Sequence, residues 1–339
     1  MTTDEQSVIM SVRDLTTTFL TRRGPSPAVR GVSFDLMRGK VLAIVGESGC
    51  GKSATAMSLM RLLRPRFARI GGRVRLDGTD LSVLSERQMG RVRGRRMAMI
   101  FQEPMTSLNP LMTIGYQLSE PMRVHLHLDR NAAHRRGIEL LDLVGISAAP
   151  QIMASYPHQL SGGMRQRAMI AIALSCDPQV LIADEPTTAL DVTIQSQILF
   201  LLHEIRERTK MSIIMITHDL GVVSEFADDV LVMYSGRVIE RGRTSELLER
   251  PLHPYTYGLL RSIPDLENRV ERLKTIAGTV PDPFSPPPGC AFHPRCDRGV
   301  DACTNAVPRL ESFGNCGGKS VACIRPLGID EVDAVGVPA

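Results

Sequence analysis

The stretch VLAIVGESGCGKS, residues 41–53, decides the fold of this chain of 339 residues. Residues 41–45 are a continuous apolar run, which is typical of a strand buried on both faces of a parallel sheet. The glycine-rich run 46–53 follows, and residues 54–63 then predict a helix that ends before Pro65. A strand, a glycine loop and a helix in this order are the context that a phosphate-binding P-loop requires, so the alternative of a chance glycine-rich turn is disfavoured.

Each residue type in this loop suits the binding of a nucleoside triphosphate. The glycines let backbone N–H groups wrap the phosphates, and the N-terminus of the following helix adds a positive dipole. Lys52 is a point charge for the β- and γ-phosphates, and Ser53 offers a hydroxyl to Mg²⁺. Cys50 stands where only a small residue is needed, and we assign it no chemistry. The predicted nucleotide-binding residues here are Gly46, Ser48, Gly49, Cys50, Gly51, Lys52, Ser53 and Ala54.

A second apolar strand, residues 180–183, ends in the carboxylates Asp184 and Glu185. Asp184 suits direct or water-mediated holding of Mg²⁺. Glu185 lies one residue further along and suits a general base or a group that orients the attacking water. An acidic strand end that simply faces solvent is the alternative, and the P-loop upstream disfavours it.

Between these motifs lies the run Leu160–Arg167, of sequence LSGGMRQR. A P-loop, a Leu-Ser-Gly-Gly run and a strand ending in Asp-Glu, in this order, resemble the ABC ATPases. The resemblance implies an α/β P-loop NTPase with a RecA-like mixed sheet core. It places the nucleotide-binding domain at residues 1–263, with a helical subdomain at about 103–175.

By the same resemblance, further residues take roles in a nucleotide site shared by two subunits. Gln102 would reach Mg²⁺ and link to a transmembrane partner, His218 would contact the γ-phosphate, and Asp191 would cross the dimer interface. Phe19 would stack on adenine, with an ordinary core phenylalanine as the alternative. The segment that grips the γ-phosphate held by the other subunit would be Ser161, Gly162 and Gly163.

The composition disfavours two kinds of partner, nucleic acid and a membrane that the chain itself would span. The net charge is +4 from 40 basic and 36 acidic residues, which is too weak to indicate nucleic acid. The densest basic cluster, residues 87–96, contains no aromatic residue that could stack on bases. No stretch approaches the roughly 18 apolar residues of a membrane span, and the polar start Met1–Glu5 is not a secretory signal. We therefore expect a protein kept in the cytoplasm that reaches a membrane only through partners.

Five segments resemble one group of ABC ATPases, the subunits of dipeptide, oligopeptide and nickel importers. They are VGESG at 45–49, FQEPMTSLNP at 101–110, ADEPTTALDVT at 183–193, HPYT at 253–256 and GCAFHPRC at 289–296. The sequence departs from that group at Lys40, where the group usually has Glu, and at residues 312–320. The resemblance implies an ATP- and Mg²⁺-dependent peptide-import ATPase on the cytoplasmic face of the inner membrane. Its implied partners are a second, paralogous ATPase, two permeases and an extracytoplasmic binding protein.

Other functions remain as alternatives at this stage. A nickel or other small-solute importer is the nearest one. A scaffold ATPase of DNA repair or translation usually carries tandem cassettes or long coiled coils, and this chain has one cassette and no sustained heptads. An export ATPase usually comes fused to membrane spans.

The composition changes after Pro264, where we place the start of a small C-terminal extension, residues 264–339, rich in proline and cysteine. Five of seven cysteines fall here: Cys290, Cys296, Cys303, Cys316 and Cys323. Disulfides are disfavoured in the cytoplasm, and the absence of a C-x-x-C pair makes a zinc ribbon a poor fit. By resemblance, Cys290, Cys296, Cys303 and Cys323 would hold a [4Fe–4S] cluster, with Cys316 spare. Zinc and reduced structural thiols remain the alternatives.

Overall fold

The computed structural model describes residues 7–103, 107–187, 191–262, 276–313 and 318–328. The chain folds into two compact units. Unit 1 contains residues 83–215 with short pieces at 7–9 and 37–39, and unit 2 contains residues 10–36, 40–82 and the chain from 216 onward. Among the described residues, no helix is both long and apolar enough to cross a membrane.

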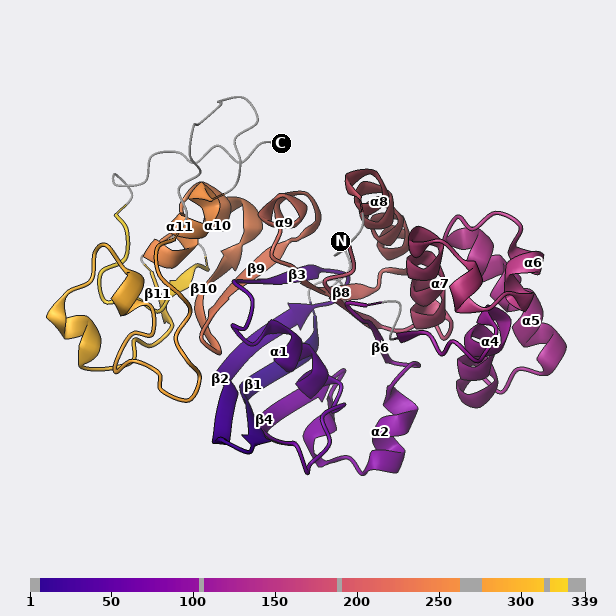
Figure 1. Ribbon diagram of the computed structural model, residues 1–339, viewed down its shortest axis with the longest axis horizontal. Coiled ribbons are helices and arrows are strands. Elements are labelled where there is room, and N and C mark those ends of the chain that lie inside the picture. The colour runs from indigo at the N-terminus through magenta and orange to yellow at the C-terminus, as the bar shows by residue number, and fades with distance from the viewer. Residues whose placement is uncertain (1–6, 104–106, 188–190, 263–275, 314–317, 329–339) are drawn as a thin grey trace. The chain divides into compact units, whose positions relative to one another are not determined.

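Unit 1 combines a short parallel sheet with a group of helices (Figure 1). Its strands β6 (Met97–Ile100), β7 (Val180–Asp184) and β8 (Ser212–Ile216) lie in the order β8-β7-β6. Strands β6 and β7 run parallel, with Ile100 opposite Ala183. All residues of the three strands are buried, as expected of continuous apolar runs in a parallel sheet.

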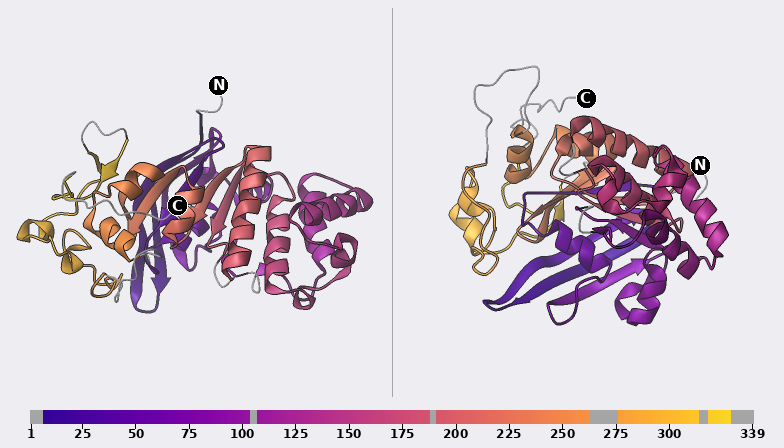
Figure 2. Two further views of the ribbon diagram at one scale, coloured as in Figure 1. Left: turned by 90° about the horizontal axis from the view of Figure 1, so that it is seen from above. Right: turned by 45° about the vertical axis from the view of Figure 1, so that its right-hand side comes forward.

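The helices of unit 1 are α2 (Glu86–Val92), α4 (Ile114–His125), α5 (Arg130–Leu143), α6 (Ala149–Ala154), α7 (Gly162–Leu174) and α8 (Val192–Thr209). Helices α4, α5 and α6 pack on one another, and α4 and α5 also contact α7 (Figures 1 and 2). Side-chain caps begin several of them: Thr113 accepts from the Tyr116 N–H, and Asp129 accepts from the Ala132 N–H. Helices α4, α5, α6 and α7 lie within the residues expected to form a helical subdomain, about 103–175, and that subdomain stays a prediction.

Unit 2 contains an antiparallel sheet with the strand order β2-β1-β4-β5, seen as long ribbons in Figure 2. The strands are β1 (Val8–Thr21), β2 (Gly24–Met37), β4 (Ala68–Leu76) and β5 (Thr79–Asp80). Strand β2 begins at Gly24 and includes Pro25 and Pro27, although glycine and proline clusters favour turns. Strand β2 is at the edge of its sheet, where a residue without an N–H is tolerated.

A second set of strands in unit 2 carries the P-loop. Strands β11 (Glu311–Ser312), β12 (Ser320–Val321), β10 (Arg237–Arg243), β9 (Asp229–Tyr234) and β3 (Val41–Val45) follow in that order. Strand β3 is parallel to β9, whereas β9, β10, β12 and β11 pair antiparallel. The helices are α1 (Lys52–Leu59), α9 (Leu220–Phe226), α10 (Thr244–Glu249) and α11 (Pro254–Arg261). Short 3₁₀ turns are η1 (Leu81–Val83) at the border of the units, η2 (Pro157–Gln159) in unit 1, and η3 (His293–Arg295) and η4 (Asp301–Thr304) in unit 2.

One hydrophobic core in unit 2 joins the P-loop strand to the C-terminal segment. Val45 of β3, Tyr234 of β9, Tyr255 of α11 and Phe292 are all buried in it. The rings of Tyr234, Tyr255 and Phe292 lie 4.7–5.4 Å apart between centroids, in tilted and edge-on arrangements. Phe292 is thus packed into the core of the nucleotide-binding part. The boundary expected near residue 264 lies outside the described residues and stays a prediction.

Most of the expected elements are present with shifted ends. The strand expected at 41–45 is β3 with the same bounds, and the strand expected at 180–183 is β7, one residue longer. The helix expected at 54–63 begins at Lys52 and ends at Leu59, and Arg61 after it has the left-handed φ of 50°.

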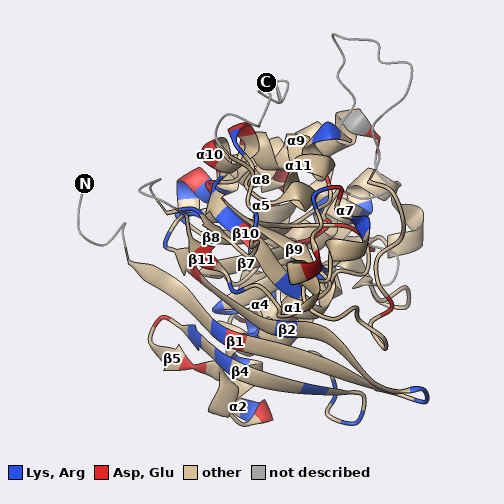
Figure 3. Ribbon diagram, turned by 90° about the vertical axis from the view of Figure 1, so that its left-hand side faces the viewer, with Lys and Arg blue, Asp and Glu red and all other residues tan. Residues whose placement is uncertain are grey.

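Basic and acidic residues are both found on the antiparallel sheet of unit 2, with basic ones more numerous (Figure 3). Arg13 pairs with Asp35 at 2.8 Å, and Arg73 lies 3.4 Å from Asp80. Lys40, at which the sequence departs from its relatives' pattern, pairs with Asp228 at 2.8 Å. These pairs are partly exposed, so each contributes little to stability.

A buried carboxylate of β10 stabilises the connection between α10 and α11. Glu240 is fully buried, and its two oxygens accept the N–H groups of Leu252 at 2.6 Å and His253 at 2.9 Å. Burial raises the pKa of Glu240 to about 7, against the lowering effect of these hydrogen bonds. Burial also lowers the pKa of His253 to about 3, and its Nδ1 accepts the Tyr255 N–H.

These two shifts predict opposite dependences of stability on pH. Because folding raises the pKa of Glu240, the unfolding free energy falls as pH rises from about 4.5 to 7. Because folding lowers the pKa of His253, the unfolding free energy rises as pH rises from about 3 to 6.5. We expect Glu240→Gln to remove only the first effect. Between pH 5 and 7, the unfolding free energy of the variant should rise relative to wild type by about 2–3 kcal/mol.

Urea unfolding at pH 5, 6 and 7 measures this difference. Glu249→Gln, at an exposed site on α10, is the matched control and should follow the wild-type curve. Parallel curves for Glu240→Gln and wild type would contradict the assignment.

Candidate functional site

The P-loop of unit 2 connects β3 to α1. Lys52 opens α1 with only 5% of its surface exposed, and its Nζ donates to the carbonyls of Gly46 at 2.7 Å and Glu47 at 3.2 Å. The ammonium therefore lies in the concavity of the loop. The loop N–H groups and the start of α1 complete an arrangement suited to phosphate.

Glycine is required at two positions of this loop because other backbone lies very close. Gly46 has φ +149°, and a Cβ there would lie 2.3 Å from the Met233 carbonyl oxygen. Gly51 has φ +105°, and a Cβ there would lie 2.3 Å from the Ala28 carbonyl oxygen. Cys50 is buried and burial raises its pKa, which agrees with a packing role and no chemistry.

The other predicted residues of this unit differ in how they are placed. Ser48 and Gly49 are exposed, whereas Ser53, Ala54 and Phe19 are partly buried. Phe19 lies near the end of β1, opposite Ala68 of β4. It is not a fully buried core residue, so the prediction of an adenine contact stays open.

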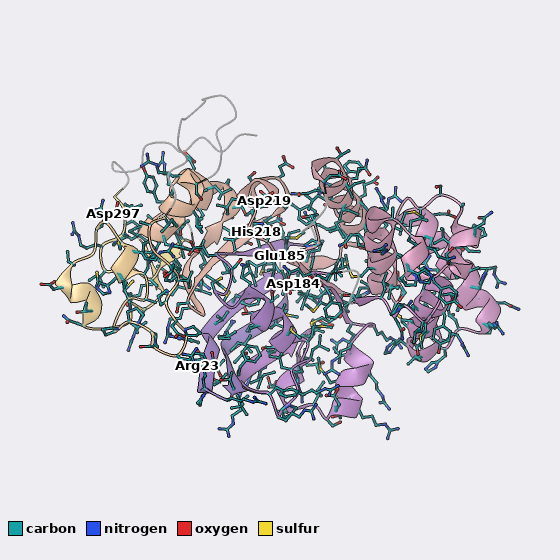
Figure 4. All side chains as sticks on the ribbon, viewed as in Figure 1. Arg23, Asp184, Glu185, His218, Asp219 and Asp297 are labelled. Carbon is teal, nitrogen blue, oxygen red and sulfur yellow. The ribbon has the colours of Figure 1, made fainter. Side chains whose placement is uncertain are left out.

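His218 of unit 2 follows β8 and is exposed, next to Asp219 (Figure 4). Asp219 begins α9 by accepting the N–H groups of Gly221 at 2.9 Å and Val222 at 3.3 Å. The Thr217 hydroxyl accepts the Asp219 N–H, and the Thr217 N–H donates to the carbonyl of Ile44 in β3. The backbone that carries His218 is therefore hydrogen-bonded to the P-loop strand.

In unit 1 the predicted carboxylates end β7 (Figure 4). Asp184 is 4% exposed, and Glu185 has the left-handed φ of 46°. The Gln102 amide donates to Glu185 Oε2 at 2.9 Å. Because β6 and β7 are parallel neighbours, residues just past their carboxyl ends meet at one edge of the sheet. The structure thus brings together Gln102 and Glu185, which the sequence assigned to separate motifs.

The Leu-Ser-Gly-Gly segment of unit 1 begins α7. Ser161 is the N-cap residue, and its hydroxyl accepts the Met164 N–H. A Cβ at Gly162 would meet nothing within 4 Å, so the helix N-terminus is open there. Asp191 caps α8 by accepting the Ile194 N–H at 2.9 Å. Gln166 of α7 donates to the carbonyl of Pro186, next to the Asp184–Glu185 pair.

Sequence reasoning missed one contact of the P-loop. The backbone N–H of Glu47 donates to the hydroxyl of Tyr255 at 2.9 Å. Tyr255 belongs to the HPYT stretch, which the sequence marked only as a family feature. That stretch was the signal available, but nothing local to it points to the P-loop, 208 residues away.

The cysteines of the C-terminal segment gather around one small cavity of about 20 Å³. Cys290, Cys296, Cys303 and Cys323 all line it, together with His253. Burial raises the pKa of Cys290, of Cys296 and, to about 11, of Cys323. These thiols are therefore protonated at neutral pH unless a metal displaces the protons. Cys316 lies outside the described residues.

The arrangement distinguishes between kinds of metal site. Among the described residues, no three His, Cys, Asp or Glu side chains are close enough to hold one metal ion. A zinc site needs its donors around a single ion, at about 2.0–2.3 Å. An iron–sulfur cluster binds each thiolate to a different iron, so its ligands share a cavity without converging on a point. The cavity that the four cysteines line has room for little more than a water molecule.

Comparison with known proteins assigns the family. Residues 29–188 match the ABC transporter family, and residues 239–303 match the C-terminal region of oligopeptide/dipeptide transporters. The oligopeptide transport ATP-binding protein AppD of Bacillus subtilis is 49% identical over 94% of this chain and 96% of its own length. The chain belongs to the ABC transporter family. The dipeptide transport ATP-binding protein DppD of the same organism is 51% identical over 88% of this ABC ATPase and 90% of its own length.

Solved structures confirm the ABC ATPase fold. The ATP-binding cassette MJ0796, in a dimer bound to ADP and phosphate, aligns with a TM-score of 0.63 at 25% identity, covering 69% of this chain and 98% of that one. The cbiO1 subunit from Clostridium perfringens aligns with a TM-score of 0.60 at 30% identity, covering 71% and 91%. Membership of this family makes the chain an ATPase for which ATP and Mg²⁺ are the expected ligands, as the sequence predicted. The roles of the individual site residues stay predictions.

We expect Glu185→Gln to retain ATP binding and to hydrolyse ATP at least about 100-fold more slowly, because a carboxamide cannot accept a proton from water. A phosphate-release assay and a nucleotide-binding assay on the same preparation measure the two effects. Glu207→Gln, at an exposed carboxylate of α8 paired with Lys210, is the matched control. A wild-type turnover rate in Glu185→Gln would remove Glu185 from this role.

Proposed function

We propose that this chain is the ATP-hydrolysing subunit of an importer of di- and oligopeptides. The observation that carries the proposal is the pair of matched segments: an ABC ATPase segment followed by the C-terminal region found in oligopeptide and dipeptide transporters. Relatives named as oligopeptide and dipeptide transport proteins match along nearly the whole chain. This favours peptide over nickel or another small solute, and an importer over a scaffold in DNA repair or translation.

The site residues divide between two nucleotides in this proposal. The P-loop binds the phosphates of the chain's own ATP through Lys52 and backbone N–H groups. Ser53, Gln102 and Asp184 hold Mg²⁺. The open N-terminus of α7, with Ser161, Gly162 and Gly163, offers N–H groups and a hydroxyl to the γ-phosphate of ATP held by a partner ATPase.

Hydrolysis then needs a positioned water and a proton acceptor. Glu185 accepts the proton, and its hydrogen bond from Gln102 orients the carboxylate. His218 contacts the γ-phosphate, and Asp191 meets the partner ATPase. The energy for transport comes from the different affinities of closed and open dimers for ATP.

Exposed apolar side chains support a membrane partner. After Gln102, Leu111 is 85% exposed and Tyr116 is 48% exposed, both in unit 1. Apolar side chains of this size gathered on one surface segment are typical of a protein contact. We infer that this segment docks on two permeases, at the cytoplasmic face of the membrane. A paralogous ATPase and an extracytoplasmic binding protein complete the importer.

Transport by the assembled importer tests the cargo. The complex is reconstituted in vesicles with labelled dipeptides, longer peptides and Ni²⁺. We expect ATP-dependent uptake of peptide that is abolished, to below about 1% of wild type, when this chain carries Glu185→Gln. Uptake of Ni²⁺ alone would overturn peptide as the cargo. Recovery of only ribosomes or DNA in a pulldown would overturn the importer itself.

We further propose that Cys290, Cys296, Cys303 and Cys323 hold a [4Fe–4S] cluster. The observation that supports the proposal is the common cavity that these four cysteines line. When bound, the cluster would supply a covalent link among the segments that carry these cysteines. The proposed role is structural, because no other feature of the described residues suggests electron transfer.

Anaerobic purification tests the cluster. We expect about four irons and four sulfides per chain and absorption near 400 nm for a [4Fe–4S] centre. Cys303→Ser should lose most of the iron, whereas Cys176→Ser, at a buried cysteine of unit 1, should retain it. Zinc in place of iron, or four free thiols with no metal, would contradict the proposal.

A further inference from the structure

An arginine of the C-terminal segment contacts the P-loop directly. Arg295 ends η3, next to Cys296 in the chain. Its two terminal nitrogens bind both carboxylate oxygens of Glu47, at 2.6 Å and 3.0 Å. The Arg295 side chain is 5% exposed and that of Glu47 is 27% exposed. A bidentate pair of this kind, largely withdrawn from water, is stronger and more directional than a surface ion pair.

The rest of the Arg295 guanidinium is also held. Its Nε donates to the carbonyl of Ala277 at 2.9 Å, and Nη2 donates to that of Ile276 at 3.3 Å. Nη1 also donates to the hydroxyl of Tyr234 at 3.3 Å. The hydrogen bond with Glu47 is the main cause that raises the pKa of Arg295, which stays charged at any working pH. The guanidinium thus has a single orientation, directed at Glu47.

Glu47 is in turn part of the phosphate-binding loop. Its backbone N–H donates to Tyr255, and its carbonyl accepts from Lys52 Nζ at 3.2 Å. An ionised carboxylate in this loop lies close to the site where phosphates with several negative charges bind. Without a partner, its charge would oppose the binding of ATP.

The same arginine lies in the segment that carries two of the cavity cysteines. The His293 N–H donates to the Cys290 carbonyl at 3.1 Å, and the Cys296 N–H donates to the His293 carbonyl at 3.2 Å. Residues 290–296 therefore form one tight turn. Phe292 of this turn is packed in the core beside Tyr234 and Tyr255. The position of the turn fixes the position of Arg295.

We propose that Arg295 is a positioning residue for ATP binding, which holds the P-loop through Glu47 and neutralises the Glu47 carboxylate. The C-terminal segment is then part of the nucleotide site of its own chain. This role needs only the ion pair and the loop, so it is independent of the transported solute and of any metal bound by the cysteines.

A double-mutant cycle in the full chain tests the proposal. It compares the parent, Arg295→Ala, Glu47→Gln and the variant with both substitutions. The affinity for Mg·ATP is measured with all variants in a Glu185→Gln background, so that hydrolysis does not interfere. We expect Arg295→Ala to raise the Kd for ATP about tenfold, because Glu47 is left charged and unpaired. Glu47→Gln added to Arg295→Ala should return the Kd to within about threefold of Glu47→Gln alone. If Glu47→Gln restores the ATP affinity of Arg295→Ala, the loss of affinity came from the unpaired Glu47 carboxylate and not from a general loss of structure.

Two outcomes would overturn the proposal: an unchanged Kd in Arg295→Ala, or a raised Kd that Glu47→Gln does not lower. If Arg295→Ala does not fold, the same comparison uses Arg295→Lys, which keeps the charge but not the bidentate geometry. Its smaller loss of affinity must likewise disappear when Glu47→Gln is added. The matched control is Arg23→Ala. Arg23 lies just before β2, and its substitution removes an exposed ion pair, at 3.6 Å, with Asp282 of the C-terminal segment. Its Kd for ATP should equal that of the parent.

Discussion

The close approach of backbone to backbone around the P-loop is the constraint on which unit 2 depends. The carbonyls of Met233 and Ala28 occupy the space where side chains at Gly46 and Gly51 would lie. The Gly236 N–H, in the turn after β9, donates to the carbonyl of Cys50 at 2.9 Å, and the Arg30 N–H donates to that of Gly236. The loop is thus held in place by backbone of β2 and of the turn after β9. Strands from distant parts of the chain have to be in register before this loop has its binding shape.

The residues expected to act on ATP are spread over both compact units. Unit 2 supplies Lys52 and His218, whereas unit 1 supplies Glu185 with Gln102, and Ser161 at the start of α7. Each group is rigid locally, because strand ends, helix caps and short hydrogen bonds fix it within its own unit. The proposed roles therefore draw on groups whose local geometry is set separately within each unit.

Much of this was predictable from sequence where the signal is local. The strand, glycine loop and helix at 41–59 are contiguous, and so are β7 with Asp184 and α7 with its Ser161 cap. Errors arose where tertiary position overrides local preference: β2 begins at Gly24 because an edge strand tolerates Pro25 and Pro27. The contacts of Glu47 with Tyr255 and Arg295 span 208 and 248 residues and leave no local pattern. The hydrogen bond between Gln102 and Glu185 likewise depends on the pairing of β6 with β7.

Glu185 illustrates what function costs the fold. Its left-handed backbone is unfavourable for a residue with a side chain, by about 1–2 kcal/mol, and glycine would relieve it. If stability alone were selected, glycine would be favoured at position 185. In the role proposed for Glu185, replacing it by glycine would relieve the backbone and would remove the proton acceptor, so stability and turnover would change in opposite directions.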